Sequence, residues 1–405
     1  MLYRLEIENF FSVRDRQVID LTVAPNVPDP EGRYAPIFTS SQQRAPKVVA
    51  VLGANASGKT TVLRALEFVV SMVRDSAQRT GFPCERFNDV ESASRPIRLA
   101  IELGGVMNLS PETMKRIQDG GAAEEGLYRY ELSIEVKNGQ AQRIDSESLR
   151  QKPLGQGKWQ RVFERTADNT VKDSKFFALS GYQHLLNTLR PNASVLASFA
   201  LFQHPTATLF VEMARRALFQ LDAAPVQDQQ VVQYLAQHPD ILARLNKELS
   251  RIDVGVESVR VENTPQGPAP LFKHSGLHAE MPWILESHGT RTFIKMFPGI
   301  AVTLAQGGLF AIDELDAFIH PLILPEIVRW FYDKASRNTH DAQLWLTCHS
   351  ASLLDALNKE EIVLCEKDRQ GRSRVYCLMD VKVRRDDNHY RKYLSGVYGG
   401  VPHIG

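Results

Sequence analysis

The chain has 405 residues, 43% of them hydrophobic, so it can bury a large core in one interrupted domain or in two, and it is neither disordered nor fibrous. Its 48 Lys and Arg residues balance 47 Asp and Glu residues, which excludes blanket electrostatic attraction to nucleic acid or to an anionic membrane. The four cysteines form no C-x-x-C pair, which argues against a disulfide framework or a structural zinc site and favours a reducing compartment.

The amino-terminal residues lack the pattern of a targeting segment. Arg4, Glu6 and Glu8 interrupt the apolar run that a signal peptide needs. No stretch approaches the ~18 apolar residues of a membrane-spanning helix. We therefore expect a cytoplasmic protein that makes no membrane contact.

The first part of the chain predicts strands followed by a helix. Residues 1–23 are typical of two short strands around the turn Asn9 to Arg16, and residues 25–46 of a loop. The apolar run Val48 to Leu52 predicts a buried strand, and Thr61 to Val70 shows helical spacing after a glycine-rich turn.

The middle of the chain changes from strands to helices. Alternating apolar residues predict antiparallel strands at 97–103 and 128–136. Residues 180–252 favour helices, most clearly Asp240 to Ile252, whose apolar positions share one face. Strands are expected again at Leu309 to Ile312, Leu344 to Thr347, Ile362 to Cys365 and Val375 to Leu378.

This order predicts an α/β fold with a split nucleotide-binding head. The head has a mixed sheet with flanking helices and an antiparallel β subdomain, and a mainly helical insertion interrupts it. The expected division is residues 1–75 and 281–405 for the head, 76–180 for the β-rich subdomain and 181–280 for the insertion.

The segment GANASGKT fits the pattern G-x-x-x-x-G-K-S/T between a predicted strand and a predicted helix, the context that a P-loop requires. Its glycines let backbone N–H groups point at phosphate oxygens, Lys59 contacts the β and γ phosphates, and Thr60 offers a hydroxyl to Mg²⁺. The residues expected to bind ATP are Gly53, Ala54, Asn55, Ala56, Ser57, Gly58, Lys59, Thr60 and Thr61.

A Walker B pattern follows downstream, where the apolar residues Leu309 to Ile312 run into two carboxylates. A buried parallel strand would place Asp313 at its carboxyl end beside the P-loop, where it can hold Mg²⁺ with Thr60. Glu314 lies one residue further and is placed to polarise the attacking water. The less specific alternative is an exposed acidic turn at the end of a strand.

Two weaker segments complete the set of candidate site residues. His349 comes just after another predicted strand, where its imidazole could contact a γ-phosphate or the lytic water, although a lone histidine is usually structural. Ser287, Gly289 and Thr290 in the segment LESHGTRTF mark a helix start, which is either an anion site or an ordinary helix cap.

With these four elements in this order, the chain resembles the ABC-type ATPases of the RecF, SMC and OLD group. It resembles in particular the compact ATP-binding proteins of bacterial phage-defence and abortive-infection systems. The resemblance rests on LEIENFFSVRD, the P-loop, the Ser-x-Gly segment, DELDAFIHP and TCHS, while residues 75–275 match only loosely.

The resemblance implies that two heads sandwich two ATP molecules, so that Ser287 and Gly289 act on the partner's nucleotide. It also implies Glu314 as catalytic base and His349 as switch residue. Lys59 is a third expected catalytic residue, on the ground of its contact with the β and γ phosphates. The segment ESHGT departs from the LSGGQ of transporters, and no Q-loop glutamine can be placed. Residues 350–405 are too few for the Toprim nuclease domain of OLD-type proteins.

The leading hypothesis is therefore a Mg-ATP-hydrolysing, dimerising switch that regulates a separately encoded effector nuclease or toxin in anti-phage defence. The alternative is a RecF-like DNA-repair ATPase. Residues 137–175 carry nine Lys or Arg against five Asp or Glu, with Trp159 and Phe163 between them, which is a candidate DNA contact or a solvated hairpin. A catalytically dead scaffold is a third class, but Glu314 is intact.

The closing segment VKVRRDDNHYRKYLSGVYGGVPHIG is basic, aromatic and rich in glycine. It resembles the closing segment of many defence-type ATPases. We expect it either to pack on the ATPase core through Tyr390, Tyr393 and Tyr398 or to dock a partner.

Overall fold

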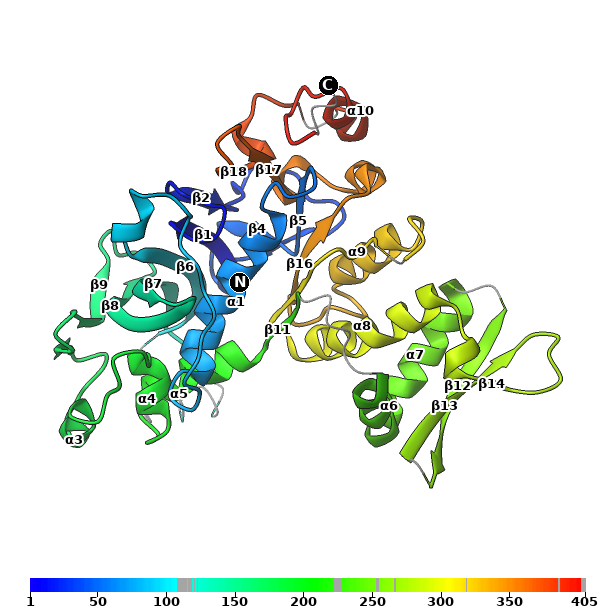
Figure 1. Ribbon diagram of the computed structural model, residues 1–405, viewed down its shortest axis with the longest axis horizontal. Helices are drawn as coiled ribbons and strands as arrows, with labels where there is room; N and C mark the ends of the chain where they lie inside the picture. Colours follow the sequence, from blue (N-terminus) through cyan, green and yellow to red (C-terminus); the bar gives the residue numbers. More distant parts are fainter. Residues whose placement is uncertain are drawn as a thin grey trace.

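The computed structural model describes residues 1–401 except 108–114, 116–118, 120, 122, 222–227, 253–254, 266, 318 and 385–386. Residues 402–405, the end of the closing segment that the sequence singles out, lie outside the described residues. Two sheets and the helices around them form the main body, and a smaller lobe projects from it at the right of Figure 1. Among the described residues, no helix has the length and apolar composition needed to cross a membrane.

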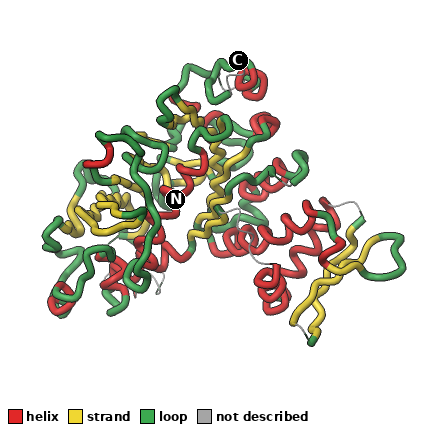
Figure 2. The backbone as a smooth tube through the Cα atoms, viewed as in Figure 1, coloured by secondary structure: helices red, strands yellow, loops and turns green. Residues whose placement is uncertain are grey.

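A six-stranded sheet runs through the centre of the body, and its strands are yellow in Figure 2. In sheet order it contains β11 (Ala217–Gln220), β15 (Leu309–Ile312), β16 (Gln343–Cys348), β5 (Val48–Gly53), β17 (Ile362–Lys367) and β18 (Ser373–Cys377). All neighbours are parallel except β17 and β18. Five of these strands were expected from the sequence and are confirmed, with small differences at their ends.

Successive side chains of a strand point to opposite faces of the sheet. The two faces of this sheet therefore pack in two different hydrophobic clusters. From β5, Val49 and Val51 join a cluster with α1 (Lys59–Asp75) and the antiparallel sheet. Val48, Ala50 and Leu52 join the cluster on the opposite face, which contains α8 (His288–Gln306) and α9 (Leu324–Tyr332). Burial on both faces explains why these strands are continuous apolar runs.

A second sheet of seven antiparallel strands packs beside α1. Its order is β10 (Val171–Lys172), β9 (Gln160–Arg165), β8 (Gln140–Pro153), β7 (Glu125–Lys137), β6 (Ile97–Val106), β1 (Leu2–Glu8) and β2 (Gln17–Asp20). The predicted strands at 1–23, 97–103 and 128–136 are confirmed. Together the sheets give the expected α/β fold with a mixed sheet, flanking helices and an antiparallel β subdomain.

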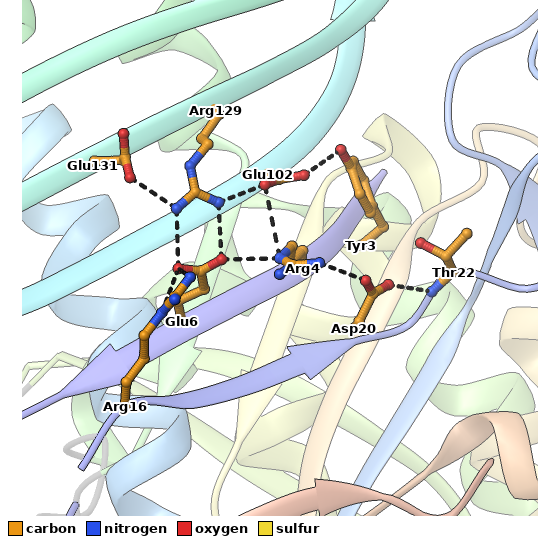
Figure 3. A network of polar contacts seen from close by, with 9 residues as sticks. All are labelled: Tyr3, Arg4, Glu6, Arg16, Asp20, Thr22, Glu102, Arg129 and Glu131. Carbon is orange, nitrogen blue, oxygen red and sulfur yellow. Dashed lines mark hydrogen bonds and ion pairs between the residues drawn. The ribbon is translucent and has the colours of Figure 1, made fainter. Parts of the chain in front are cut away.

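A network of charged side chains, shown in Figure 3, ties β1 to its neighbours on this second sheet. Arg129 of β7 donates to Glu6 of β1 and to Glu102 of β6, while Arg16 donates to Glu6 at 2.7 Å. Burial alone would raise the pKa of Glu6, but hydrogen bonds from Arg129, Arg16 and Arg4 outweigh it and lower the pKa to about 2. The charges thus fix the position of the strand that leads to the turn at Asn9 to Arg16.

A buried ion pair joins the same sheet to α4 (Val195–Ala200). Glu147 of β8 lies 3.6 Å from Arg165 of β9, accepts a hydrogen bond from Tyr130 at 2.8 Å and accepts the N–H of Val195 at 2.9 Å. Burial raises the pKa of Glu147 and lowers that of Arg165, so each charge depends on the other.

We predict that Glu147→Ala lowers the free energy of unfolding by about 3 kcal/mol or more, because it leaves Arg165 buried without its carboxylate. Urea denaturation followed by fluorescence measures the change. The control is Glu135→Ala, which breaks an exposed pair with Arg143 and should cost less than about 1 kcal/mol. Equal costs for the two variants would contradict the role given to this pair.

Residues 181–280 contain the predicted helices, among them α7 over the segment expected at 240–252, and also strands that the sequence did not predict. The helices are α3 (Gln183–Leu186), α4, α5 (Pro205–Arg215), α6 (Asp228–Gln237) and α7 (Pro239–Ile252). The unexpected strands are β11, β12 (Val256–Thr264) and β13 (Gly267–His274). The range is mainly helical, as the sequence predicts, but it also contributes strands: β11 joins the central sheet, and β12 and β13 pair with β14 (Met281–Pro282) in the lobe.

The lobe consists of α6, α7 and the three strands β12, β13 and β14, and it contacts the body through α8 (Figure 1). We define it as residues 228–282. α8 begins at the Ser-x-Gly segment Ser287 to Gly289, which we call the signature segment. Leu249 and Ile252 of the lobe line the same groove as this segment.

One further expectation from the sequence is corrected, and in the basic range 137–175, whose role stays a prediction, the structure places Phe163 in the core. The range 25–46 is a loop with two short paired strands, β3 (Tyr34–Pro36) and β4 (Arg44–Pro46). In the basic range 137–175, Phe163 is fully buried and packs on Phe177 with ring centroids 4.9 Å apart. The ring of Phe163 is therefore part of the core and cannot stack on a base.

The closing segment packs on the body, which was one of its two expected roles. Tyr393 and Tyr398 are buried and Tyr390 is partly buried against the same hydrophobic cluster. Its helix α10 (His389–Leu394) contacts the 3₁₀ turn Ala351–Ala356, which follows His349 (Figure 1).

Candidate nucleotide-binding site

The predicted P-loop connects the end of β5 to the start of α1, and two of its positions need glycine. Gly58 has φ 109°, and a Cβ there would lie 2.4 Å from the hydroxyl oxygen of Ser373. Gly53 has φ 156°, and a Cβ there would lie 2.3 Å from the carbonyl oxygen of Cys365. Any larger residue would therefore strain the backbone and displace β17 or β18.

Lys59 is the first residue of α1, and its side chain folds back over the loop. Its Nζ donates to the carbonyl oxygens of Gly53 at 2.9 Å and Ala54 at 3.1 Å, and it lies 3.5 Å from Nδ1 of His349. Burial lowers the pKa of Lys59, partly offset by the nearby carboxylates Asp313 and Glu314. A cation held at the positive end of a helix dipole creates a local site for an anion.

Thr60 and Asp313 meet as the Walker B pattern predicts. The Thr60 hydroxyl donates to one carboxylate oxygen of Asp313 at 2.8 Å, and the Thr347 hydroxyl donates to the other. Thr347 in turn accepts the N–H of Glu314 at 2.7 Å. This chain of bonds fixes the end of β15 against β16 and points hard oxygen atoms at the P-loop.

Glu314 and His349 face each other across the same opening. Glu314 has φ 50°, a strained conformation for a residue with a side chain, and its side chain is 57% exposed. Its carboxylate oxygen lies 3.6 Å from Nε2 of His349. A carboxylate that is free to reach solvent at this point can contact a water molecule next to a bound phosphate.

Asp316 is a polar residue of this region that the sequence analysis missed. Its carboxylate accepts the backbone N–H of His349 at 2.9 Å and that of Ser350 at 2.5 Å. It thereby ties the turn after β15 to the turn after β16. The only sequence signal was its place three residues after Asp313, which does not reveal a contact with residue 349.

A cleft with a volume of about 650 Å³, large enough for a nucleotide, is lined by P-loop residues including Lys59 and Thr60 and by Glu314 and His349. The sequence analysis did not identify the walls of this cleft, which include Phe11, Ser12, Glu85, Arg86, Phe87, Asn88, Lys367 and Gly371. Phe11 lies on the predicted turn between β1 and β2, and the guanidinium of Arg64 lies 5.7 Å from its ring centroid. Its half-buried ring provides an aromatic surface at the cleft.

Ser287 and Gly289 are not in this cleft. They line a separate groove of about 970 Å³, together with Ala317 and His320 from the segment after Walker B. Ser287 caps α8 as predicted, because its hydroxyl oxygen accepts the N–H of Thr290 at 3.1 Å. Within one chain, the structure thus separates the P-loop from the signature segment.

The closing segment also reaches the P-loop. The N–H of Gly400 donates to Glu366 of β17 at 2.9 Å, and the Tyr393 hydroxyl donates to the carbonyl oxygen of Gly400 at 3.0 Å. A Cβ on Gly400 would lie 3.8 Å from Cα of Gly53. The carboxyl-terminal segment therefore supports the first residue of the loop.

The residues present fit ATP and Mg²⁺. The hydroxyl oxygen of Ser57 is buried inside the loop without a hydrogen-bond partner in the described part of the chain. Lys59 bonds to two neutral carbonyl groups of the loop, which a phosphate group could replace as its partners. Thr60 and Asp313 supply one hydroxyl and one carboxylate, the small set of ligands that Mg²⁺ takes beside phosphate and water.

The parallel sheet, the glycine-dependent loop at a helix start and the carboxylates at the end of β15 define a P-loop nucleotide-binding protein of the ABC type. The chain belongs to the family described as AAA domain, putative AbiEii toxin, Type IV TA system, whose model matches residues 48–355. This range starts at β5 and includes the P-loop, the signature segment, Walker B and His349.

Two SMC heads are among the solved structures to which this chain is similar. The SMC head domain from Thermotoga maritima is 11% identical, with a TM-score of 0.43, over 94% of this chain and 99% of that chain. The Smc head domain with an extended coiled coil bound to the C-terminal domain of ScpA, from Pyrococcus furiosus, is 13% identical, with a TM-score of 0.41, over 98% of this chain and 100% of that chain. No curated protein matches the chain.

Proposed function

We propose that the chain binds Mg-ATP in the 650 Å³ cleft and hydrolyses it. The supporting observation is that Lys59, Glu314 and His349 come from three different elements and converge on this one cleft. Lys59 binds the β and γ phosphates, Thr60 and Asp313 hold the magnesium ion, and bound magnesium neutralises phosphate charge. Glu314 takes a proton from water, and His349 orients that water or the terminal phosphate.

The ATPase acts as a switch through pairing of two copies. The side chain of Ser287 is exposed, and the groove it lines lies apart from its own P-loop cleft. Each signature segment is thus free to contact a nucleotide held by a second copy, so that ATP closes a dimer and hydrolysis opens it.

The biological role that we propose is regulation in anti-phage defence, with a separately encoded nuclease or toxin as effector. The support is the family to which residues 48–355 belong, since its description names an abortive-infection toxin and a toxin–antitoxin system. An effector would bind the lobe or the closing segment, because these surfaces move when two heads close.

The test is to express the chain alone and with its neighbouring gene, then to challenge cells with a panel of phages. We expect protection only from the pair, and loss of protection when the chain carries Lys59→Ala. Protection by the single chain, or by the pair with Lys59→Ala, contradicts the regulatory role. Sensitivity to DNA damage after deletion of the gene would favour the RecF-like repair alternative instead.

A further inference from the structure

A hydrogen bond connects the lobe to the residue just before the signature segment. His274 ends β13 of the lobe, and its Nε2 lies 2.8 Å from a carboxylate oxygen of Glu286. Glu286 directly precedes Ser287. Residues 275–285, which include β14 of the lobe, connect His274 to Glu286, so the hydrogen bond closes a loop of chain that ends at the signature segment.

Glu286 also holds the backbone of the signature segment. Its second carboxylate oxygen accepts the N–H of Ser287 at 2.7 Å, while its first contacts His274. The residue is only 6% exposed. A buried carboxylate needs partners for both oxygen atoms, so its position and that of Ser287 depend on His274.

The hydroxyl of Ser287 is fixed from the other side by α8. Its oxygen accepts the N–H of Thr290 at 3.1 Å and lies 2.7 Å from the Thr290 hydroxyl. The exposed Ser287 side chain thus has a defined direction, which is set by Glu286 before it and by the helix after it. A second contact, between Lys295 of α8 and Asp228 of α6, holds the lobe along the same helix.

We propose that Glu286 and His274 form a positioning pair that aligns Ser287 with the nucleotide of a second copy and makes this alignment depend on the lobe. The inference rests on the proposed ATP-dependent dimer. Neither residue lines the P-loop cleft of its own chain. A partner that moves β13 would shift Ser287 through this pair and so change dimer closure without a contact at either nucleotide.

The experiment uses the full chain with Glu314→Gln, in which ATP should trap the dimer, and adds Glu286→Ala. We expect the affinity for ATP, measured with a fluorescent analogue, to change less than about twofold, because the P-loop cleft is intact. The concentration at which ATP yields dimers, measured by light scattering, should rise about tenfold or more, as expected when a charge-assisted hydrogen bond is lost.

Two substitutions of His274 distinguish loss of the positioning contact with Glu286 from general disruption of the fold. His274→Ala should weaken dimerisation like Glu286→Ala, whereas His274→Gln can still donate to Glu286 and should restore it to within about threefold. With Glu314 intact, the alanine variants should lower kcat and leave KM for ATP nearly unchanged. The control is Glu257→Ala, which removes the exposed partner of Lys273, a lobe pair 2.7 Å apart.

The outcomes distinguish this inference from the function on which it rests. If the Glu314→Gln protein does not dimerise with ATP, the proposed switch fails, and the positioning role fails with it. If that protein dimerises and both alanine variants dimerise equally well, the switch stands and the pair has no positioning role. If Glu286→Ala does not fold, the comparison of His274→Ala with His274→Gln decides.

Discussion

Glu314→Gln is expected to slow ATP hydrolysis by about a hundredfold or more while ATP binding is kept, the scale of effect when a general base is lost. The amide has nearly the same size as the carboxylate but cannot accept the proton of an attacking water. Glu314 is free to act in this way because Asp313, not Glu314, bonds to Thr60. Phosphate release and equilibrium binding of ATP measure the two effects separately.

The matched control is Glu85→Gln, which removes another carboxylate from the lining of the same cleft. It should retain hydrolysis within a few-fold of the wild type, because it lies on the loop after α1 and not beside the Walker B strand. With ATP, the Glu314→Gln protein should show the mass of a dimer. The same mass with and without ATP would contradict the closure of two heads around nucleotide.

Lys59→Ala is expected to remove most ATP affinity, by about a hundredfold or more, because it deletes the charge that pairs with the β and γ phosphates. In the structure this Nζ bonds to carbonyl oxygens of the loop itself, 2.9 Å from Gly53, so it already lies where phosphate enters. Titration of a fluorescent ATP analogue measures the loss.

The control for this variant is Lys334→Ala, which removes an exposed lysine that pairs with Asp341 at 2.9 Å, next to the start of β16. It should bind ATP like the wild type. Circular dichroism should show that Lys59→Ala is folded. Unchanged nucleotide binding by folded Lys59→Ala would refute the P-loop assignment.

The sequence predicts the central elements of the site because their chemistry depends on local patterns. The P-loop spacing, the apolar run before Asp313 and the helix start at Ser287 each lie within a few residues, and the structure places them on the expected strand ends and helix starts. The roles of these residues in catalysis stay predictions until the variants are measured.

The residues that the sequence did not reveal act through contacts between distant segments. Asp316 meets the turn at residue 349, and Phe11 enters the cleft from the turn after β1. The strand β11, with the sequence ALFQ, follows α5 directly and is extended because it pairs with β15. No local periodicity distinguishes four such residues from the end of a helix.

The division into domains at 75, 180 and 280 also stays a prediction. The structure shows that β11 from the range 181–280 belongs to the central sheet, next to β15. The lobe at 228–282 is the part of that range that projects from the body. Because α8 links this lobe to the signature segment, the lobe is the better candidate for the element that couples to a partner.

Because the closing segment contacts the P-loop, a substitution in this segment that abolishes partner binding does not by itself identify a partner-binding surface. Gly399 has φ 75°, and a Cβ there would lie 1.6 Å from a carboxylate oxygen of Glu366, so any substitution must push Glu366 away from Gly400. A screen for variants that fail to recruit an effector would therefore collect substitutions at Gly399 and Gly400 whose primary defect is in nucleotide binding. Each such variant should be tested for ATP affinity before its position is assigned to a binding surface for another protein.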